Sequence, residues 1–171
     1  MNEYIFDDYE YQLIVEDILN HKEFLKTKEI THHGTTRYNH SLKVSYRAYK
    51  FAKLIGLDYN AVARAGLLHD FFLVDNKDIS FREEVNTLWN HPVYAVKYAS
   101  KFFKLSDKEQ DIISTHMFPI GITRIPRYLE SWIVSTVDKE VALEEKSFSV
   151  KTAAVRMINF AFIIFLSYLG K

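Results

Sequence analysis

Two strongly polar side chains, His69 and Asp70, stand in the middle of an apolar stretch of this 171-residue chain. They follow Ala65-Gly66-Leu67-Leu68 and precede Phe71-Phe72. Burying a carboxylate is costly unless a cation or strong hydrogen-bond donors meet it. The fold must therefore bring other polar groups to this doublet.

Four more histidines and acids, widely spaced along the chain, are candidates to meet the doublet. Together with it they form the ordered set His40, His69, Asp70, His91, His116 and Asp138. Imidazole and carboxylate groups suit Zn, Fe, Mn, Co or Ni, and a carboxylate can bridge two cations. If these side chains converge, the sequence predicts a metal-dependent hydrolase.

Each candidate ligand also has a purely structural interpretation. A single histidine is more often a surface or hydrogen-bonded core residue than a ligand, and His21 fits a solvated helix end. Asp138 precedes a run of charges typical of an exposed helix face, but it follows an apolar run from Trp132 to Val137. The charges after it are Lys139, Glu140, Glu144 and Glu145. We expect Asp138 to be partly buried, where it needs a cation or strong donors.

Composition favours an all-α fold with a sizeable core. Hydrophobic residues make up 48% of the chain and include 13 Phe and 11 Tyr, which argues against disorder. With only five Gly and three Pro, long helices are favoured over a β fold. We predict a single compact helical bundle over residues 1–171, with about seven helices.

Charge and cysteine content exclude some partners and sites. The formal net charge is zero, and no cluster of Lys and Arg would hold duplex nucleic acid. A small anionic substrate remains compatible, because a metal pair supplies positive charge itself. The chain has no cysteine, which excludes disulfides and cysteine-ligated zinc.

Neither end of the chain has the pattern of a secretion signal or a membrane span. The first eleven residues carry four acids, the opposite of a basic-then-apolar signal, so we expect a cytoplasmic location. The apolar run Met157–Leu169 is shorter than the about 20 residues that span a bilayer. We expect it to form a buried core helix or a homodimer interface, and the alternative is a membrane-surface or partner-binding element.

Hydrophobic spacing and end signals predict the helices of the first half of the chain. A first helix is expected over about residues 8–20, and a second from near Asn39 until Gly56 stops it. Asp58 is the predicted N-cap of a third helix, which ends at the doublet. The polar segment 31–36 is predicted to be turn-rich.

The next predicted helix begins at a proline. Residues 73–90 have no regular pattern, and Pro92 suits the first turn of a helix, which leaves His91 just outside it. Ser106 and Glu109 fit a capping box that opens the following helix.

The last helices carry or flank the remaining candidates. The capping-box helix ends near His116, and a helix from about residue 127 carries Asp138. Ser149 is a predicted cap for a C-terminal helix over about 150–169. The six candidate ligands therefore fall on or beside five helices, and tertiary packing must bring them together, as helix bundles do.

The ordered pattern His…His-Asp…His…His…Asp resembles the HD-domain superfamily of metal-dependent phosphohydrolases. The local contexts that carry the resemblance are Arg37-Tyr38-Asn39-His40-Ser41, Gly66-Leu67-Leu68-His69-Asp70, His91-Pro92, Ile113-Ser114-Thr115-His116 and Ser135-Thr136-Val137-Asp138. The resemblance implies an all-helical fold with a metal-binding core over about residues 33–143.

The resemblance also implies which residues hold metal. A first divalent cation would be held by His40, His69, Asp70 and Asp138. In family members with two metals, the aspartate of the doublet bridges and two further histidines hold the second ion; His91 and His116 match those positions. A two-metal centre is therefore favoured, and the ions remain open among Fe, Mn, Co, Ni, Zn and Mg.

The resemblance predicts hydrolysis of a small phosphorylated substrate, such as a nucleotide. Two cations about 3.5–4 Å apart hold a water, lower its pKa and clamp phosphoryl oxygens. A hydroxide held in this way beside Asp70 would attack phosphorus, which makes His69 and Asp70 the predicted catalytic pair. Arg37, three residues before His40, either contacts a substrate phosphate or makes a structural salt bridge.

Two other functions fit the same residues. One is oxygen-dependent cleavage at a di-iron centre, which rare relatives carry out. The other is a non-catalytic binding or scaffold module that keeps a closed metal site for structure; the intact set of six ligands counts against it. The doublet continues with Phe71-Phe72 where many two-metal members have glycine and lysine, so no phosphate contact from such a lysine is expected.

Overall fold

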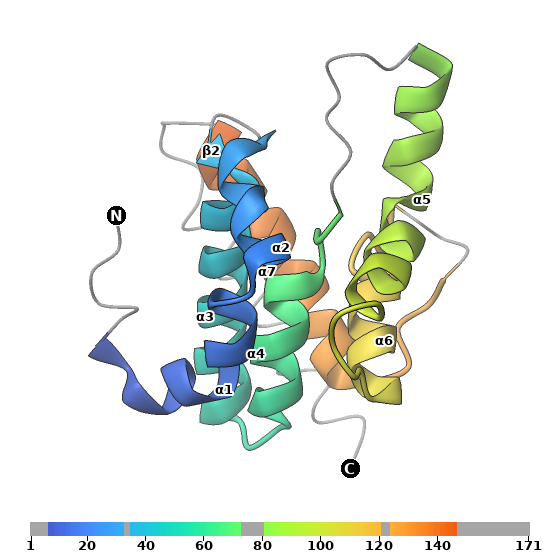
Figure 1. Cartoon of the computed structure of the whole chain (residues 1–171). Coiled ribbons are helices and arrows are strands. Elements are labelled where there is room, and N and C mark those ends of the chain that lie inside the picture. The colour runs from blue at the N-terminus through green and yellow to red at the C-terminus, as the bar shows by residue number, and fades with distance from the viewer. Residues whose placement is uncertain (1–6, 33–34, 73–80, 121–123, 147–171) are drawn as a thin grey trace.

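The computed structural model describes residues 7–32, 35–72, 81–120 and 124–146. Within these ranges the chain forms seven α-helices, one 3-10 helix and a two-residue strand pair. Figure 1 shows α3 and α4 packed together, with α1 and α7 against them and α5 and α6 on the other side of α4. The predicted all-α fold is confirmed.

The N-terminal helices follow the predicted start and stop signals. Helix α1 spans Tyr9–Leu19, α3 spans Arg37–Leu54 and α4 spans Tyr59–Leu68. Gly56 ends α3 with a φ of 74°, a left-handed conformation that glycine adopts without a Cβ clash. The Asp58 carboxylate accepts from the Ala61 amide and caps α4, as predicted.

The segment between α1 and α3 is more regular than its sequence indicates. It contains a one-turn helix α2 (Lys22–Leu25), a 3-10 helix η2 (Lys26–Glu29), and strands β1 (Thr31–His32) and β2 (Thr35–Thr36). The strands pair antiparallel, with Thr31 opposite Thr36. Elements this short depend on neighbouring structure more than on sequence pattern. The turn-rich interpretation of residues 31–36 therefore missed the strand pair, and no element was predicted for residues 22–29.

The prediction for the segment around Pro92 is wrong. Helix α5 spans Phe81–Ala99, so residues 81–90 are helical and both His91 and Pro92 lie inside the helix. A proline inside a helix removes one backbone hydrogen bond, and tertiary packing outweighs that loss here because both residues are buried. Residues 73–80, also predicted to be irregular, lie outside the described part of the chain.

The last two described helices match their signals closely. Helix α6 spans Asp107–Thr115 and opens with the predicted capping box, in which Ser106 and Glu109 bond each other's backbone amides. Helix α7 spans Leu129–Lys146. The predicted Ser149 cap and the C-terminal apolar helix fall on residues 147–171, outside the described ranges.

The two central helices, α3 and α4, approach each other closely at Gly66. A Cβ added to Gly66 of α4 would lie 2.8 Å from the Ser45 Cα of α3, closer than two such atoms can come. The core around this contact includes the fully buried side chains of Tyr11, Tyr49, Leu67, Leu68, Ile112 and Ile133. No helix within the described ranges is long and apolar enough to cross a membrane.

Candidate metal centre

Five helices deliver the six candidate ligands to one place in the core. His40 lies in the first turns of α3, His91 in α5 and Asp138 in α7. His69 and His116 are the C-caps of α4 and α6, and Asp70 follows His69 directly. All six side chains belong to residues that are at most 9% exposed. The fold therefore gathers polar groups that are far apart in the sequence.

The ligand atoms form two groups that share one carboxylate. His40, His69 and Asp70 make one group and Asp70, His91 and His116 make the other; within each group the ligand atoms lie within 4.8 Å of one another. Asp138 Oδ1 lies 3.0 Å from His40 Nε2 and 3.5 Å from His69 Nε2. We call His40, His69 and Asp138, with Asp70, the first half of the centre, and His91 and His116, with Asp70, the second half.

Two of the histidine rings are oriented by the ends of their own helices. His69 Nδ1 lies 2.8 Å from the Gly66 carbonyl oxygen, and His116 Nδ1 lies 2.8 Å from the Ile113 carbonyl oxygen. A carbonyl only accepts, so each Nδ1 carries the proton and donates it. Each Nε2 then presents a lone pair toward the centre, which is the form that binds metal.

The His40 ring is oriented by a carboxylate from another helix. Its Nδ1 lies 2.8 Å from Glu145 Oε2 of α7, and its Nε2 faces Asp138. The second oxygen of Glu145 accepts from Lys43 Nζ at 2.8 Å. A carboxylate that holds the outer nitrogen of a ligand histidine is a recurring arrangement in metal sites.

The residues present fit divalent cations. His69 Nε2 is buried and has no hydrogen-bond partner among the described residues, which is costly unless something else binds it. His91 Nε2 and His116 Nε2 lie 2.8 Å apart, within hydrogen-bonding distance. Two nitrogens that each lie about 2.0–2.1 Å from one cation are about 3 Å apart, so this pair is spaced like two ligands of one ion.

The two halves of the centre differ in how readily their histidines become protonated. Burial opposes protonation of His40, but its bonds to Asp138 and Glu145 outweigh burial and raise its pKa to about 10. Burial raises the pKa of Asp138, yet its contacts with His40 and His69 hold that pKa well below its usual value. Burial and the neighbouring His91 lower the pKa of His116 to about 3. The first half therefore attracts positive charge, and His116 stays neutral.

The order and clustering of these side chains match a known protein family. The family model described as HD domain matches residues 37–146, which is more than half of the chain and contains all six candidate ligands. The chain belongs to the HD-domain family. No curated protein and no solved structure matches it. Membership in the HD family, together with the clustered His and Asp side chains, indicates divalent-metal binding and a metal-dependent hydrolase type of function.

In this HD domain Arg37 is a buried residue next to the doublet. It is 3% exposed, and its Nη1 donates to the carbonyl oxygen of Phe72. Its guanidinium lies 4.0 Å from the centroid of the Phe72 ring, and that ring lies 5.8 Å from the ring of His91. Arg37 thus supports the segment that follows the doublet. Its predicted contact with a substrate phosphate stays a prediction.

Sequence reasoning did not assign a supporting role to two residues, Glu145 and Lys139, that contact a candidate ligand of this HD domain. Glu145 was one of the charges taken as typical of a solvated face, yet it lies seven residues after Asp138, two helical turns away on the same side of α7. That spacing was the available signal. Lys139 donates to the His116 carbonyl oxygen at 2.8 Å and to two oxygens of Ser135, so it joins α6 to α7.

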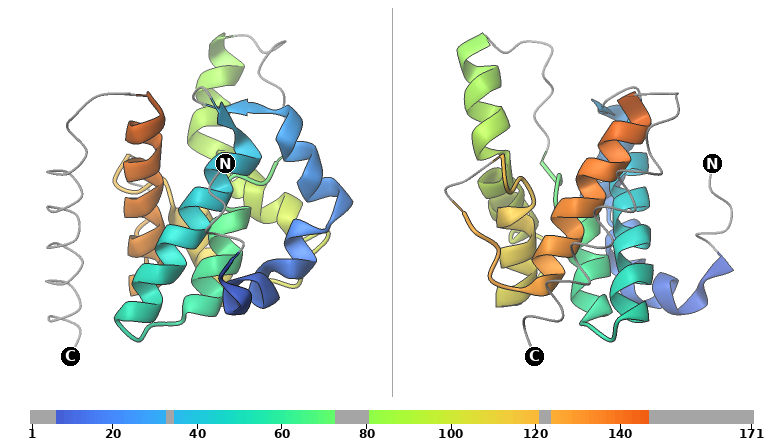
Figure 2. Two further views of the ribbon diagram at one scale, coloured as in Figure 1. Left: turned by 90° about the vertical axis from the view of Figure 1, so that its left-hand side faces the viewer. Right: turned by 180° about the vertical axis from the view of Figure 1, so that it is seen from behind.

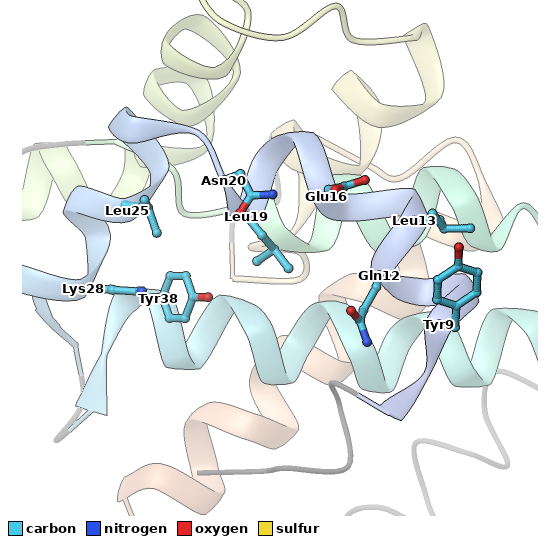
Figure 3. Close-up of a pocket in the computed structure, with 9 residues that line it drawn as sticks. All are labelled: Tyr9, Gln12, Leu13, Glu16, Leu19, Asn20, Leu25, Lys28 and Tyr38. Atoms are coloured by element: carbon cyan, nitrogen blue, oxygen red, sulfur yellow. The ribbon is translucent and has the colours of Figure 1, made fainter.

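The described part of the chain also forms a pocket whose lining residues differ from the candidate ligands. It has a volume of about 590 Å³ and lies between α1, η2 and the first turn of α3 (Figure 3). Tyr9, Leu13 and Tyr38 give it an apolar lining, and Glu16 and Lys28 add charge. None of the six candidate ligands lines it, so the pocket is distinct from the metal centre.

Proposed function

We propose that this HD domain is a phosphohydrolase that cleaves a nucleotide or another small phosphoester at a two-metal centre. His40, His69, Asp70 and Asp138 would hold one divalent cation, and Asp70, His91 and His116 would hold the other. The metals would come from Fe, Mn, Co, Ni, Zn and Mg, which all suit nitrogen and carboxylate ligands to different degrees.

The observation that carries this proposal is the position of the Asp70 carboxylate. Its Oδ2 lies 3.8 Å from His69 Nε2, whereas its Oδ1 lies 3.4 Å from His91 Nε2 and 3.6 Å from His116 Nε2. The two oxygens of one side chain therefore face the two halves of the centre. A bridging carboxylate is placed in this way.

The other residues hold Asp70 and the rings in place. The Gly66 and Ile113 carbonyls fix the tautomers of His69 and His116, so both present Nε2 inward. Arg37 holds the Phe72 carbonyl and thereby the chain directly after the doublet. The chemistry that a bound cation pair supplies is to lower the pKa of water and to neutralise charge at a phosphoryl group.

The test is metal analysis of the purified full-length chain, coupled to a screen of nucleotides and generic phosphoesters. The chain is stripped and reloaded separately with Mn, Fe, Co, Ni, Mg and Zn. We expect close to two ions per chain and phosphate release with at least one metal. Asp70→Ala should lose both ions and the activity. Asp17→Asn, which alters a carboxylate on the surface of α1, is the matched control and should keep both.

Three results would contradict the proposal. A chain that binds only trace metal after reloading has no metal centre. Oxygen uptake that depends on iron, without phosphoester cleavage, would identify a di-iron oxygenase instead. Tight metal binding without turnover of any substrate in the screen would indicate a metal-stabilised binding module.

A further inference from the structure

His40 differs from the other anchored histidines because it lies inside a helix. Gly66 and Ile113, which orient His69 and His116, are within the last four residues of their helices, where carbonyls have no helical partner. His40 is the fourth residue of an 18-residue helix, so the carbonyls before it accept helical amides. Its outer nitrogen needs an acceptor from elsewhere in the fold.

Glu145 supplies that acceptor from α7. Both of its oxygens are engaged by α3: Oε2 lies 2.8 Å from His40 Nδ1, and Oε1 lies 2.8 Å from Lys43 Nζ. The Glu145 side chain is only 5% exposed, and Lys43 lies three residues after His40, on the same side of α3. Figure 2 shows α7 lying alongside α3 in both views, which brings residue 145 to the first turns of α3.

An ordinary interhelical salt bridge is the competing interpretation. The same two helices are joined by Arg47, which pairs with Glu140 at 3.3 Å and with Glu144 at 2.7 Å. Neither of those pairs includes a candidate ligand. Glu145 differs because it is more buried than Glu144 and bonds directly to a ligand ring.

We propose that Glu145 is a positioning residue for the metal centre: it holds His40 in the tautomer and ring orientation that present Nε2 to the first half. Lys43 in turn fixes the Glu145 carboxylate. This inference rests on metal binding at the proposed centre, and it does not depend on which reaction the centre catalyses.

The test is the affinity of the full-length chain for Zn²⁺, measured by competition with a chromophoric chelator. Loss of an outer partner of a ligand histidine typically weakens metal binding about 10- to 100-fold. We expect a loss in this range for Glu145→Ala. Glu145→Gln should lose less, because its amide oxygen still accepts from His40 Nδ1, and it also serves if the alanine variant folds poorly.

Glu144→Gln is the matched control, since it removes an interhelical pair one residue away. It should bind Zn²⁺ within about twofold of the unaltered chain, a spread smaller than any expected ligand effect. A second readout is the ¹⁵N spectrum of the His40 ring in the zinc-loaded protein. Its Nδ1–H signal should shift in Glu145→Gln and stay in place in Glu144→Gln.

The outcomes separate this inference from the proposed function. Unchanged zinc affinity in both Glu145 variants would overturn the positioning role, and so would an equal loss in Glu144→Gln. A chain that binds zinc, weakens with Glu145→Ala and hydrolyses no phosphoester would overturn the phosphohydrolase assignment alone. A chain that binds no cation would overturn both.

Discussion

The two halves of the candidate metal centre share Asp70, but different kinds of groups hold their side chains in place. In the first half, Asp138 contacts both histidines, and the Glu145 carboxylate is hydrogen-bonded to the outer nitrogen of His40. In the second half, His116 is backed by a neutral carbonyl, and Asp70 is the acid within ion-pair distance of both rings. Coulomb attraction therefore favours a cation in the first half.

The difference teaches that sharing Asp70 does not make the two groups of candidate ligands equivalent. The first half also has the larger negative charge, because Asp138 adds a second carboxylate there to the one of Asp70. We expect the first half to fill at the lower cation concentration. The second half should fill later and empty first on dilution or chelation.

The largest effect is expected from the residue that the halves share. Asp70→Asn keeps the size of the side chain but removes its charge, so both halves lose a ligand. Metal content should fall from about two ions per chain to far below one, since ligand loss exceeds the about 100-fold effect of outer partners. Elemental analysis after reloading measures this. Retention of one full ion would show that Asp70 serves a single half.

Replacing one histidine in each half should show which half gives the tighter binding event. His116→Ala should abolish the weaker binding event and leave the tighter one within a few-fold. His40→Ala should weaken the affinity of the tighter binding event by more than about 100-fold. Calorimetric titration with Mn²⁺ distinguishes the two events, and His21→Gln is a control outside the centre. Loss of the tighter event in His116→Ala would reverse our ranking of the halves.

A change in helix packing should affect the first half more than the second. An alanine methyl at Gly66 would lie 2.8 Å from the Ser45 Cα, so α3 and α4 must separate, and with them His40 and His69. Overpacking of this kind costs about 1–3 kcal/mol. Urea unfolding of Gly66→Ala should show that loss of unfolding free energy. Zinc titration should show a lower affinity for the tighter of the two binding events.

Gly56→Ala provides the comparison for that variant. Its added methyl meets nothing within 4 Å, but its φ of 74° disfavours alanine by about 1–2 kcal/mol. It should lower stability without weakening metal binding. If Gly66→Ala and Gly56→Ala behave alike in both measurements, the close approach of α3 and α4 has no special role in the centre.

The smallest effect should come from a helix cap remote from both halves. Ser106→Ala removes the capping box of α6, which costs about 1 kcal/mol of stability. The altered position lies at the opposite end of α6 from His116, so metal affinity should not change. Thermal unfolding with and without Zn²⁺ measures both quantities, and a large drop in zinc affinity would show that the whole of α6 must be rigid to hold His116.

The sequence predicts the elements whose ends carry strong local signals. Gly56, Asp58 and the capping box at Ser106 each satisfy backbone groups locally, so their helices are where the pattern indicates. Pro92 is the counterexample. Its usual place is a first turn, but burial among neighbouring helices keeps α5 continuous through it, which local signals cannot reveal.

The candidate site divides in the same way. The six candidate ligands could be proposed because their residue types and order form a pattern. Glu145 and Lys139 act through contacts between helices, for which the only sequence signal was the spacing of Glu145 from Asp138. Arg37 shows the same limit. Its position before His40 left a phosphate contact and a structural salt bridge both open, and local signals did not indicate the contacts with the carbonyl and ring of Phe72 that the fold makes.

The most direct test of this account is a crystal structure of the Mn²⁺-loaded chain with anomalous scattering recorded at the manganese edge. The account predicts two peaks, one among His40, His69 and Asp138 and one between His91 and His116, with one Asp70 oxygen on each ion. A single peak, or two ions that do not both contact Asp70, would contradict it.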